Sequence, residues 1–213
     1  MIKRIIFDED ETLIKWDKKY DLKVNEALEE LNIKYTKEEA IKLLEAFNNY
    51  ENEYLIFSIE KMYEFINKYT NKKYPIEIVT KVLEKWGTCV PKSLEPEVIS
   101  TLKYLNTKYE LVILTDWFKK PQLNRLKLLK IDKYFTKIYA AEHTKRKPYK
   151  EAFLQAIENL KPEECVMVGD SLKKDIIGAI NMKIKPIWIN EKQEKIDFEC
   201  IQIRKIEELK SIL

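Results

Sequence analysis

A short apolar run near the start of the chain is followed directly by acidic residues, and this junction limits most strongly what the chain can fold into. Ile5-Ile6-Phe7 has the pattern of a buried strand, and Asp8 and Asp10 follow it directly. In extended backbone, residues two apart point to the same side, so their carboxylates repel unless a cation or a shared proton lies between them. Such acids are either solvated loop residues, a metal site, or a nucleophile beside an acid/base partner.

The composition favours a globular protein with no membrane or nucleic-acid partner. The 213 residues are 45% hydrophobic and 35% charged, enough for one large domain or for a core domain with a small second one. The formal net charge is only +3, which gives no support for binding nucleic acid or a membrane surface. No stretch approaches a membrane span, no signal-peptide pattern is present, and the three cysteines lack C-x-x-C spacing. We therefore expect a cytoplasmic monomer or homodimer with reduced cysteines.

The pattern from about residue 17 to residue 86 is almost purely helical. Thr36-Lys37-Glu38-Glu39 has the form of a capping box, and the apolar residues after it are spaced as one face of a helix. Further helical segments are predicted near Leu22–Leu31, Ile59–Tyr69 and Ile76–Trp86. This part of the chain therefore predicts a bundle of about four helices.

After Pro91, helical and apolar strand-like segments alternate. The predicted strands are Leu111–Leu114, Ile138–Ala140, Cys165–Val168, Ile187–Ile189 and a short one near Ile201, with helices near Pro96–Leu105, Pro121–Leu129, Tyr149–Leu160 and Lys174–Asn181 between them. Repeated units of this kind indicate a parallel sheet covered on both faces, which the first strand has to join. The predicted fold is a doubly wound α/β core of residues 1–15 and 90–213, with a helical cap of residues 16–89 inserted after the first strand.

Polar side chains collect where the predicted strands end, and in a doubly wound sheet these ends lie at one edge. Besides Asp8 and Asp10, they are Thr115-Asp116, Lys147-Pro148, and Gly169-Asp170-Ser171 with Asp175. Taken singly, each group has an ordinary structural explanation: Thr115 can cap a helix, Lys147-Pro148 can begin a helix, and Gly169-Asp170-Ser171 can form a turn. Together they bring the acids Asp8, Asp10, Asp170 and Asp175, the Thr115 hydroxyl and the Lys147 ammonium to one edge, which predicts a Mg²⁺ site and a cradle for a phosphoryl group.

Four motifs in this order resemble those of the haloacid dehalogenase superfamily, a phosphatase-rich group of hydrolases with an aspartate nucleophile. They are Asp8-Glu9-Asp10-Glu11-Thr12, Thr115 after an apolar strand, Lys147-Pro148 with Phe153 beyond, and Gly169-Asp170-Ser171 with Asp175. The resemblance spans Ile5 to Asn190, and the helices inserted after the first motif resemble the family's type 1 cap. It implies a helical cap that closes over the site.

The resemblance also implies a role for each motif residue. Asp8 would attack phosphorus and form an aspartyl-phosphate, and Asp10 would protonate the leaving oxygen and then activate water. Thr115 and Lys147 would hold the phosphoryl oxygens, with Asp116 beside them in substrate binding. The implied Mg²⁺ ligands are the Asp8 carboxylate, the backbone carbonyl of Asp10 and Asp170, with Asp175 in support.

The implied activity is that of a Mg²⁺-dependent phosphatase acting on a small phosphate monoester, and other activities remain open. A 2-haloacid dehalogenase needs no metal and typically lacks the second acid, so Asp10 argues against it. A phospho-acceptor signalling protein of the receiver type would place its acceptor on the third strand and would have no helical cap. Phosphomutase chemistry stays possible, since the same intermediate can return its phosphate to a sugar.

The substrate is less well defined. Glu11, with Thr115-Asp116-Trp117 downstream, is similar to the branch that contains 5′-nucleotidases, so a nucleoside monophosphate and a sugar phosphate are both candidates. The aromatic cap residues that could stack on a base or sugar are Trp16, Tyr20, Tyr50, Tyr54 and Phe57. We expect Glu9, Glu11, Lys145 and Arg146 to be solvated and His143 to be structural.

Overall fold

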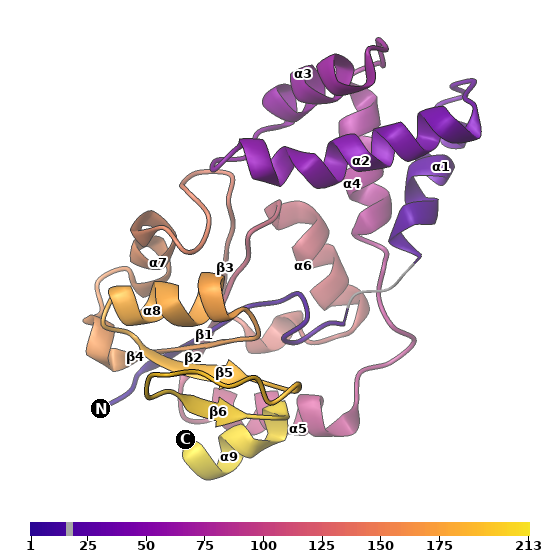
Figure 1. The fold of residues 1–213 in the computed structure, drawn as a ribbon. Helices are drawn as coiled ribbons and strands as arrows, with labels where there is room; N and C mark the ends of the chain where they lie inside the picture. The colour runs from indigo at the N-terminus through magenta and orange to yellow at the C-terminus, as the bar shows by residue number, and fades with distance from the viewer. Residues whose placement is uncertain (16–18) are drawn as a thin grey trace.

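A six-stranded parallel sheet forms the centre of this computed structural model, which describes residues 1–15 and 19–213 (Figure 1). The strands are β1 (Arg4–Phe7), β2 (Glu110–Leu114), β3 (Lys137–Tyr139), β4 (Cys165–Gly169), β5 (Lys185–Ile189) and β6 (Ile201–Ile203). They lie in the order β3-β2-β1-β4-β5-β6, so β1 pairs with β2 on one side and β4 on the other. The N-terminal strand therefore joins the sheet of the C-terminal part, as the sequence predicts.

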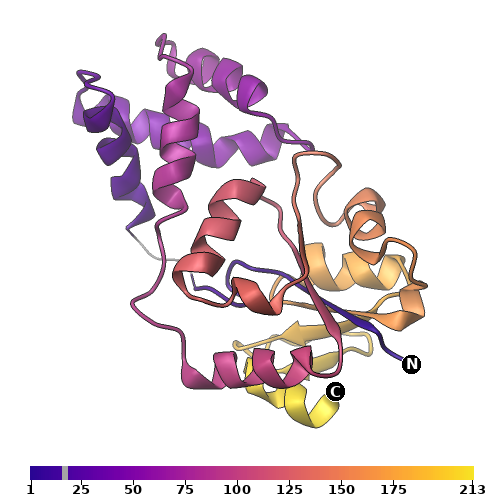
Figure 2. The same cartoon turned by 180° about the vertical axis from the view of Figure 1, so that it is seen from behind.

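Helices cover both faces of the sheet, which confirms the predicted doubly wound α/β fold. Alternation along β1 turns Ile5 and Phe7 to one face and Ile6 to the other. The first face packs against α5 (Pro96–Asn106), α6 (Lys119–Leu128) and α9 (Leu209–Ile212), and the second against α7 (Lys150–Ile157) and α8 (Gly178–Asn181). Helix α8 stands in front of the sheet in Figure 1, and α6 stands in front of it in Figure 2.

A helical bundle lies between β1 and α5 in the chain and extends away from the sheet (Figure 1). It consists of α1 (Tyr20–Glu30), α2 (Lys37–Glu53), α3 (Ile59–Thr70) and α4 (Glu77–Trp86). The predicted capping box is present, because the Thr36 side chain and the Glu39 side chain each accept from the other's backbone amide. The bundle has its own apolar cluster, which includes Val24, Phe47 and Val82. The predicted insertion of helices after β1 is confirmed, while the domain bounds stay a prediction.

The segment after β4 differs from its prediction. Instead of one helix over 174–181, Leu172–Ile177 forms a turn of π-helix, and α8 begins at Gly178. The Ile176 amide donates to the Ser171 carbonyl at 3.3 Å, five residues back, and such wide turns occur frequently at functional sites. Short 3₁₀ turns lie at Asp132–Tyr134, Pro162–Glu164 and Ile206–Glu208. Within residues 1–15 and 19–213, no helix has the length and apolar composition needed to cross a membrane.

Candidate active site

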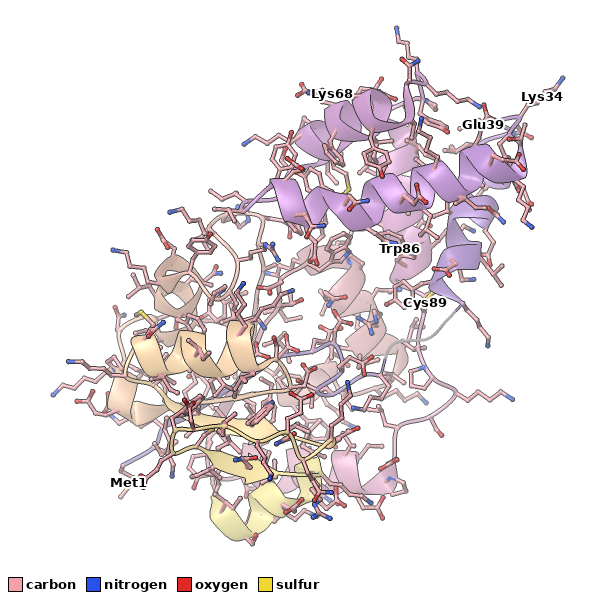
Figure 3. The ribbon with its side chains drawn as sticks, viewed as in Figure 1. Met1, Lys34, Glu39, Lys68, Trp86 and Cys89 are labelled. Atoms are coloured by element: carbon pink, nitrogen blue, oxygen red, sulfur yellow. The ribbon has the colours of Figure 1, made fainter. Side chains whose placement is uncertain are left out.

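A cavity of about 590 Å³ lies where the carboxyl ends of the strands meet the helical bundle, and this size suits a small molecule. The residues that the sequence assigned to the site all line it, namely Asp8, Asp10, Thr115, Asp116, Lys147, Asp170 and Asp175. The bundle contributes Tyr20, Asn48, Glu51 and Trp86. In Figure 3, Trp86 and Cys89 mark the end of the bundle nearest the sheet, and Lys34, Glu39 and Lys68 mark its far side.

Lys147 lies between two carboxylates inside this cavity. Its ammonium donates to Asp8 Oδ1 at 2.6 Å and to Asp175 Oδ1 at 2.7 Å. The Lys147 side chain is 2% exposed, so solvent screens these ion pairs little. The Asp8 amide donates to the Val168 carbonyl of β4, and the Lys147 amide donates to Asp116 Oδ1. These contacts fix Asp8 beside the end of β4 and hold the Lys147 backbone beside Asp116, which follows β2.

Asp8, Asp170 and Asp175 form a cluster in which one carboxylate oxygen of each residue lies within 4.8 Å of the other two. The Thr12 hydroxyl, which has no predicted role at the site, lies 3.2 Å from Asp8 Oδ2 and 3.4 Å from Asp170 Oδ1. One ammonium, that of Lys147, offsets only part of the negative charge of three carboxylates. Hard carboxylate oxygens with excess negative charge fit a divalent cation, and Mg²⁺ prefers such ligands.

The pKa values of the cluster depend on burial and on the charges of the neighbouring side chains. Burial raises the pKa of Asp8 well above its ordinary range, Lys147 opposes this rise, and Asp175 adds to it. Burial also raises the pKa of Asp170, again with a contribution from Asp175. Burial alone would lower the pKa of Lys147, but Asp175 and Asp8 keep it above its ordinary value. The lysine is therefore charged, and a cation would favour the ionised form of the carboxylates.

Gly169 is required because Asp175 approaches the backbone closely. A Cβ atom at position 169 would lie 2.3 Å from Asp175 Oδ2, closer than packed atoms come. The same oxygen accepts a hydrogen bond from the Ser171 amide at 2.9 Å. The Trp188 indole donates to the Asp170 carbonyl at 2.8 Å. Gly169-Asp170-Ser171 is therefore more than an ordinary turn, since it shapes the acid cluster.

The side chain of Asp10 is bonded to α6 and does not belong to the acid cluster. Its Oδ2 accepts from Gln122 Nε2 at 2.7 Å, and its Oδ1 accepts from Arg125 Nη1. Gln122 Nε2 also donates to Thr115 Oγ1 at 3.0 Å, which links Asp10 to Thr115. Neither Gln122 nor Arg125 belongs to a motif predicted from the sequence. Their spacing of three residues on a helix directly after Thr115 places them on one face, and this was the available signal.

Charged residues connect the helical bundle to the sheet domain beside the cavity. Glu51 of α2 lies 3.5 Å from Arg146 and 3.8 Å from Lys174. Arg146 also donates to the Glu51 carbonyl at 2.6 Å, and Lys174 lies 3.6 Å from Asp116. The prediction of a solvated Arg146 is corrected, because its side chain reaches the bundle and is only 14% exposed.

The predicted stacking aromatics do not all reach the cavity. Tyr20 lines it, whereas Tyr50 and Phe57 are 0% and 1% exposed inside the core of the bundle. The prediction that these two face a substrate is corrected, because core residues of a helix follow the same spacing. Tyr54 packs against the same core, Trp86 and Trp117 line the cavity instead, and Trp16 lies outside the described residues.

Glu9 is fully buried, although the sequence predicts a solvated loop position. Its Oε1 lies 3.4 Å from Arg125 Nη1, and neither carboxylate oxygen has a hydrogen-bond partner among the described residues. Burial, followed by the charge of Asp10, raises the pKa of Glu9 well above its ordinary range. The predictions of solvated Glu11 and Lys145 agree with side-chain exposures of 45% and 41%.

Comparison with known proteins finds a family and several relatives. The family model of haloacid dehalogenase-like hydrolases matches residues 2–183. The glyceraldehyde 3-phosphate phosphatase of Pyrococcus furiosus is 34% identical over 91 residues, which are 41% of this chain and 38% of that protein. The pyrimidine 5′-nucleotidase YjjG of Escherichia coli is 30% identical over 99 residues, which are 45% of this chain and 44% of that protein. The chain thus matches less than half the length of these two relatives.

A solved structure shares the fold over almost the whole chain. The HAD-hydrolase YfnB of Bacillus subtilis, solved bound to magnesium, superposes with a TM-score of 0.70 and is 22% identical. The match covers 99% of this chain and 98% of that one, so the sheet and the inserted helices are both included. Because the family model matches most of this chain, the chain belongs to the haloacid dehalogenase-like hydrolases.

Proposed function

We propose that the protein is a Mg²⁺-dependent phosphatase that hydrolyses a small phosphate monoester through an aspartyl-phosphate on Asp8. The observation that carries the proposal is the buried contact of 2.6 Å between Asp8 and Lys147, beside the acids Asp170 and Asp175. An ammonium and a divalent cation next to a nucleophilic carboxylate provide the charge that a transferring phosphoryl group needs. The names of the two curated relatives, both phosphatases of small phosphate esters, support the same class of reaction.

In the proposed reaction, a carboxylate oxygen of Asp8 attacks phosphorus while the bond from phosphorus to the ester oxygen breaks. Asp10 donates a proton to that leaving oxygen, and its carboxylate then accepts a proton from the water that attacks the aspartyl-phosphate. This second step releases inorganic phosphate and restores both side chains. Lys147 and the Thr115 hydroxyl bind the phosphoryl oxygens, and Asp116 holds the backbone of Lys147 in place.

The acid cluster is the proposed metal site. Asp8, Asp170 and the backbone carbonyl of Asp10 would hold Mg²⁺, which when bound supplies positive charge against the phosphoryl oxygens. Asp175 accepts hydrogen bonds from Lys147 and from the Ser171 amide through its two oxygens. This supports a role for Asp175 in holding the site together more than in binding the ion directly.

The reaction is tested with an aryl phosphate. Wild-type protein should release phosphate only with Mg²⁺ present, and Asp8→Asn should lower kcat by at least about 10³-fold. Full activity in Asp8→Asn would refute the nucleophile. Phosphate release that is first order in enzyme and needs no sugar bisphosphate would separate a phosphatase from a phosphomutase. Halide release from a 2-haloacid would instead support the dehalogenase alternative.

We propose a nucleoside monophosphate as the substrate, with a sugar phosphate as the second candidate. Trp117, which lines the cavity and is only partly buried, gives an aromatic surface on which a base can stack, and it packs against Trp86 at a ring distance of 5.7 Å. Asn48 and Glu51 offer hydrogen bonds that suit sugar hydroxyls as well.

A substrate panel, scored by kcat/KM, distinguishes the two candidates. Nucleoside monophosphates should rank above sugar phosphates, and Trp117→Leu should raise KM for a nucleotide while leaving KM for glycerol phosphate unchanged. A panel that favours sugar phosphates, with no effect of Trp117→Leu on nucleotides, would reject the nucleotide proposal.

We propose different roles for the two parts of the fold. Residues 1–15 and 90–213 would supply the chemistry, and the cap, residues 16–89, would close over the site and select the substrate. The separate apolar cluster of the bundle supports this division. A small-molecule substrate, no nucleic-acid partner, a monomer or homodimer, and a cytoplasmic location complete the proposal.

A further inference from the structure

Arg125 is a buried cation at the point where the active site meets the connections to the cap. Its side chain is 1% exposed, and Nη1 donates to Asp10 and, at 2.9 Å, to Gln122 Oε1. Its Nε donates at 3.2 Å to the carbonyl of Cys89, on the segment that returns from α4 to α5. The guanidinium also lies 5.7 Å from the centre of the Tyr20 ring, at the start of α1. One side chain therefore touches Asp10 and both ends of the cap.

The returning segment rests on α6 through further contacts. Asn124 Nδ2 donates to the Gly87 carbonyl at 2.8 Å, and a Cβ atom at Gly87 would come within 3.0 Å of Pro121 Cα. In Figure 3, Trp86 and Cys89 lie at the end of the bundle nearest the sheet domain. We call Pro121, Asn124 and Arg125 the cap seat. Of these three, Arg125 is the residue that is also bonded to an active-site acid.

The charges around Arg125 hold it in one orientation. Asp10 and the fully buried Glu9 both face its Nη1, Glu9 at 3.4 Å. A guanidinium donates in fixed directions from a planar group, and separating it from buried carboxylates leaves uncompensated charge in the interior. Because Gln122 holds the other oxygen of Asp10 at 2.7 Å, the Asp10 carboxylate is fixed from two sides.

We propose that Arg125 is a positioning residue for Asp10 and links the orientation of that carboxylate to the seating of the cap. The inference rests on the proposed function, in which Asp10 donates and then accepts a proton. When the returning segment leaves α6, Arg125 loses the Cys89 carbonyl and the Tyr20 ring, so its side chain no longer holds Asp10 in a fixed orientation and Gln122 alone remains. Proton transfer to the leaving group therefore depends on a seated cap.

The test compares two esters that differ in leaving group. Nitrophenyl phosphate has a good leaving group that needs little protonation, whereas glycerol phosphate depends on a proton donor. Arg125→Met should lower kcat at least about tenfold more for the glycerol ester than for the aryl ester, with KM little changed. Arg125→Lys should recover part of this loss because it keeps the charge. Asp10→Asn removes the proton donor and so gives the largest expected difference between the two esters in the loss of kcat.

A second readout follows the aspartyl-phosphate. If Asp10 is misplaced, water attack slows, and Arg125→Met should release a burst of nitrophenol equal to the enzyme concentration before steady turnover. A loss of stability alone would reduce the amount of active enzyme and produce no burst. The burst is therefore specific to the positioning role.

Arg4 provides a matched control. Its side chain is 5% exposed on β1 and pairs with Glu110 and Glu158, away from Asp10. Arg4→Met removes a buried guanidinium and should lower the melting temperature, while the ratio of kcat for the two esters stays unchanged. Should Arg125→Met not fold, Arg125→Lys and Asn124→Ala allow the same comparison, since Asn124→Ala weakens the cap seat without contacting Asp10.

The outcomes are distinguishable. An equal loss on both esters in the Arg125 variants, without a burst, would overturn the positioning role and leave Arg125 as a residue of the fold. A wild-type protein that hydrolyses neither ester would instead overturn the proposed function.

Discussion

The Lys147 ammonium lies 2.6 Å from a carboxylate oxygen of Asp8, a residue 139 positions earlier in the chain. Asp175 shares the same ammonium at 2.7 Å, and all three groups are largely withdrawn from solvent. In such surroundings the partners depend on one another, since removing one leaves the others uncompensated. Replacing Lys147 therefore changes the charge of the whole cluster and not one contact alone.

We expect Lys147→Met to bind Mg²⁺ more tightly while kcat falls at least about 100-fold. Loss of the ammonium leaves more net negative charge on the acid cluster, which attracts a cation more strongly. It also removes a group that offsets charge on the phosphoryl oxygens during transfer. Calorimetric titration with Mg²⁺ and turnover of an aryl phosphate measure the two effects. Lys145→Met, at a 41% exposed neighbour, should change neither, and weaker Mg²⁺ binding in Lys147→Met would contradict the charge argument.

Gly169→Ala should disturb the acid cluster through packing. The added methyl group would lie 2.3 Å from Asp175 Oδ2, so Asp175 has to move away from Lys147 and from the Ser171 amide. Overpacking of this kind costs about 1–3 kcal/mol of stability. We expect a lower melting temperature, a smaller stabilisation of the protein by added Mg²⁺, and reduced kcat. Unchanged Mg²⁺ stabilisation in a less stable variant would show that Asp175 does not support the metal site.

Arg146→Gln should weaken substrate binding more than it slows turnover. Arg146 donates to the Glu51 carbonyl at 2.6 Å and lies 3.5 Å from the Glu51 carboxylate, which joins α2 to the segment before Lys147. A more loosely held cap binds substrate less well, so KM should rise about three- to tenfold while kcat changes less. Glu51→Gln, which keeps the contact to the backbone carbonyl, should have the smaller effect. A fall in kcat with unchanged KM would argue against this role.

Glu158 should contribute to stability in a pH-dependent way. Lys137, Tyr139 and Arg4 lower the pKa of Glu158 from 4.5 to about 2. A carboxyl group with a lower pKa in the folded state stabilises the fold above its unfolded pKa and loses this effect as pH falls through the folded value. Glu158→Gln should therefore melt lower than wild type near neutral pH, by a small amount because the group is partly exposed. The difference should shrink as pH falls from about 4.5 to about 2. A difference that grows in acid would contradict the assignment.

The sheet and its helical insertion could be predicted because their signals are local. Ile5-Ile6-Phe7 is apolar over the length of a strand, and Thr36 with Glu39 forms a cap that needs no distant partner. The π-helical turn at Leu172–Ile177 could not be predicted in this way. Its wide turn coincides with the contacts of Asp175 to Lys147 and to the Ser171 amide, and the first of these depends on a segment from elsewhere in the chain.

By itself, the sequence determined which residues stand at the carboxyl ends of the strands, Asp8, Thr115 and Asp170 among them, because strand ends are a local property of the chain. Only the tertiary structure decided that Glu9 is buried, that Asp10 is held by Gln122 and Arg125, and that Tyr50 belongs to the cap core. The physical reason is that burial and pairing depend on segments distant in the chain, which come together only when the helices pack on the sheet and on each other.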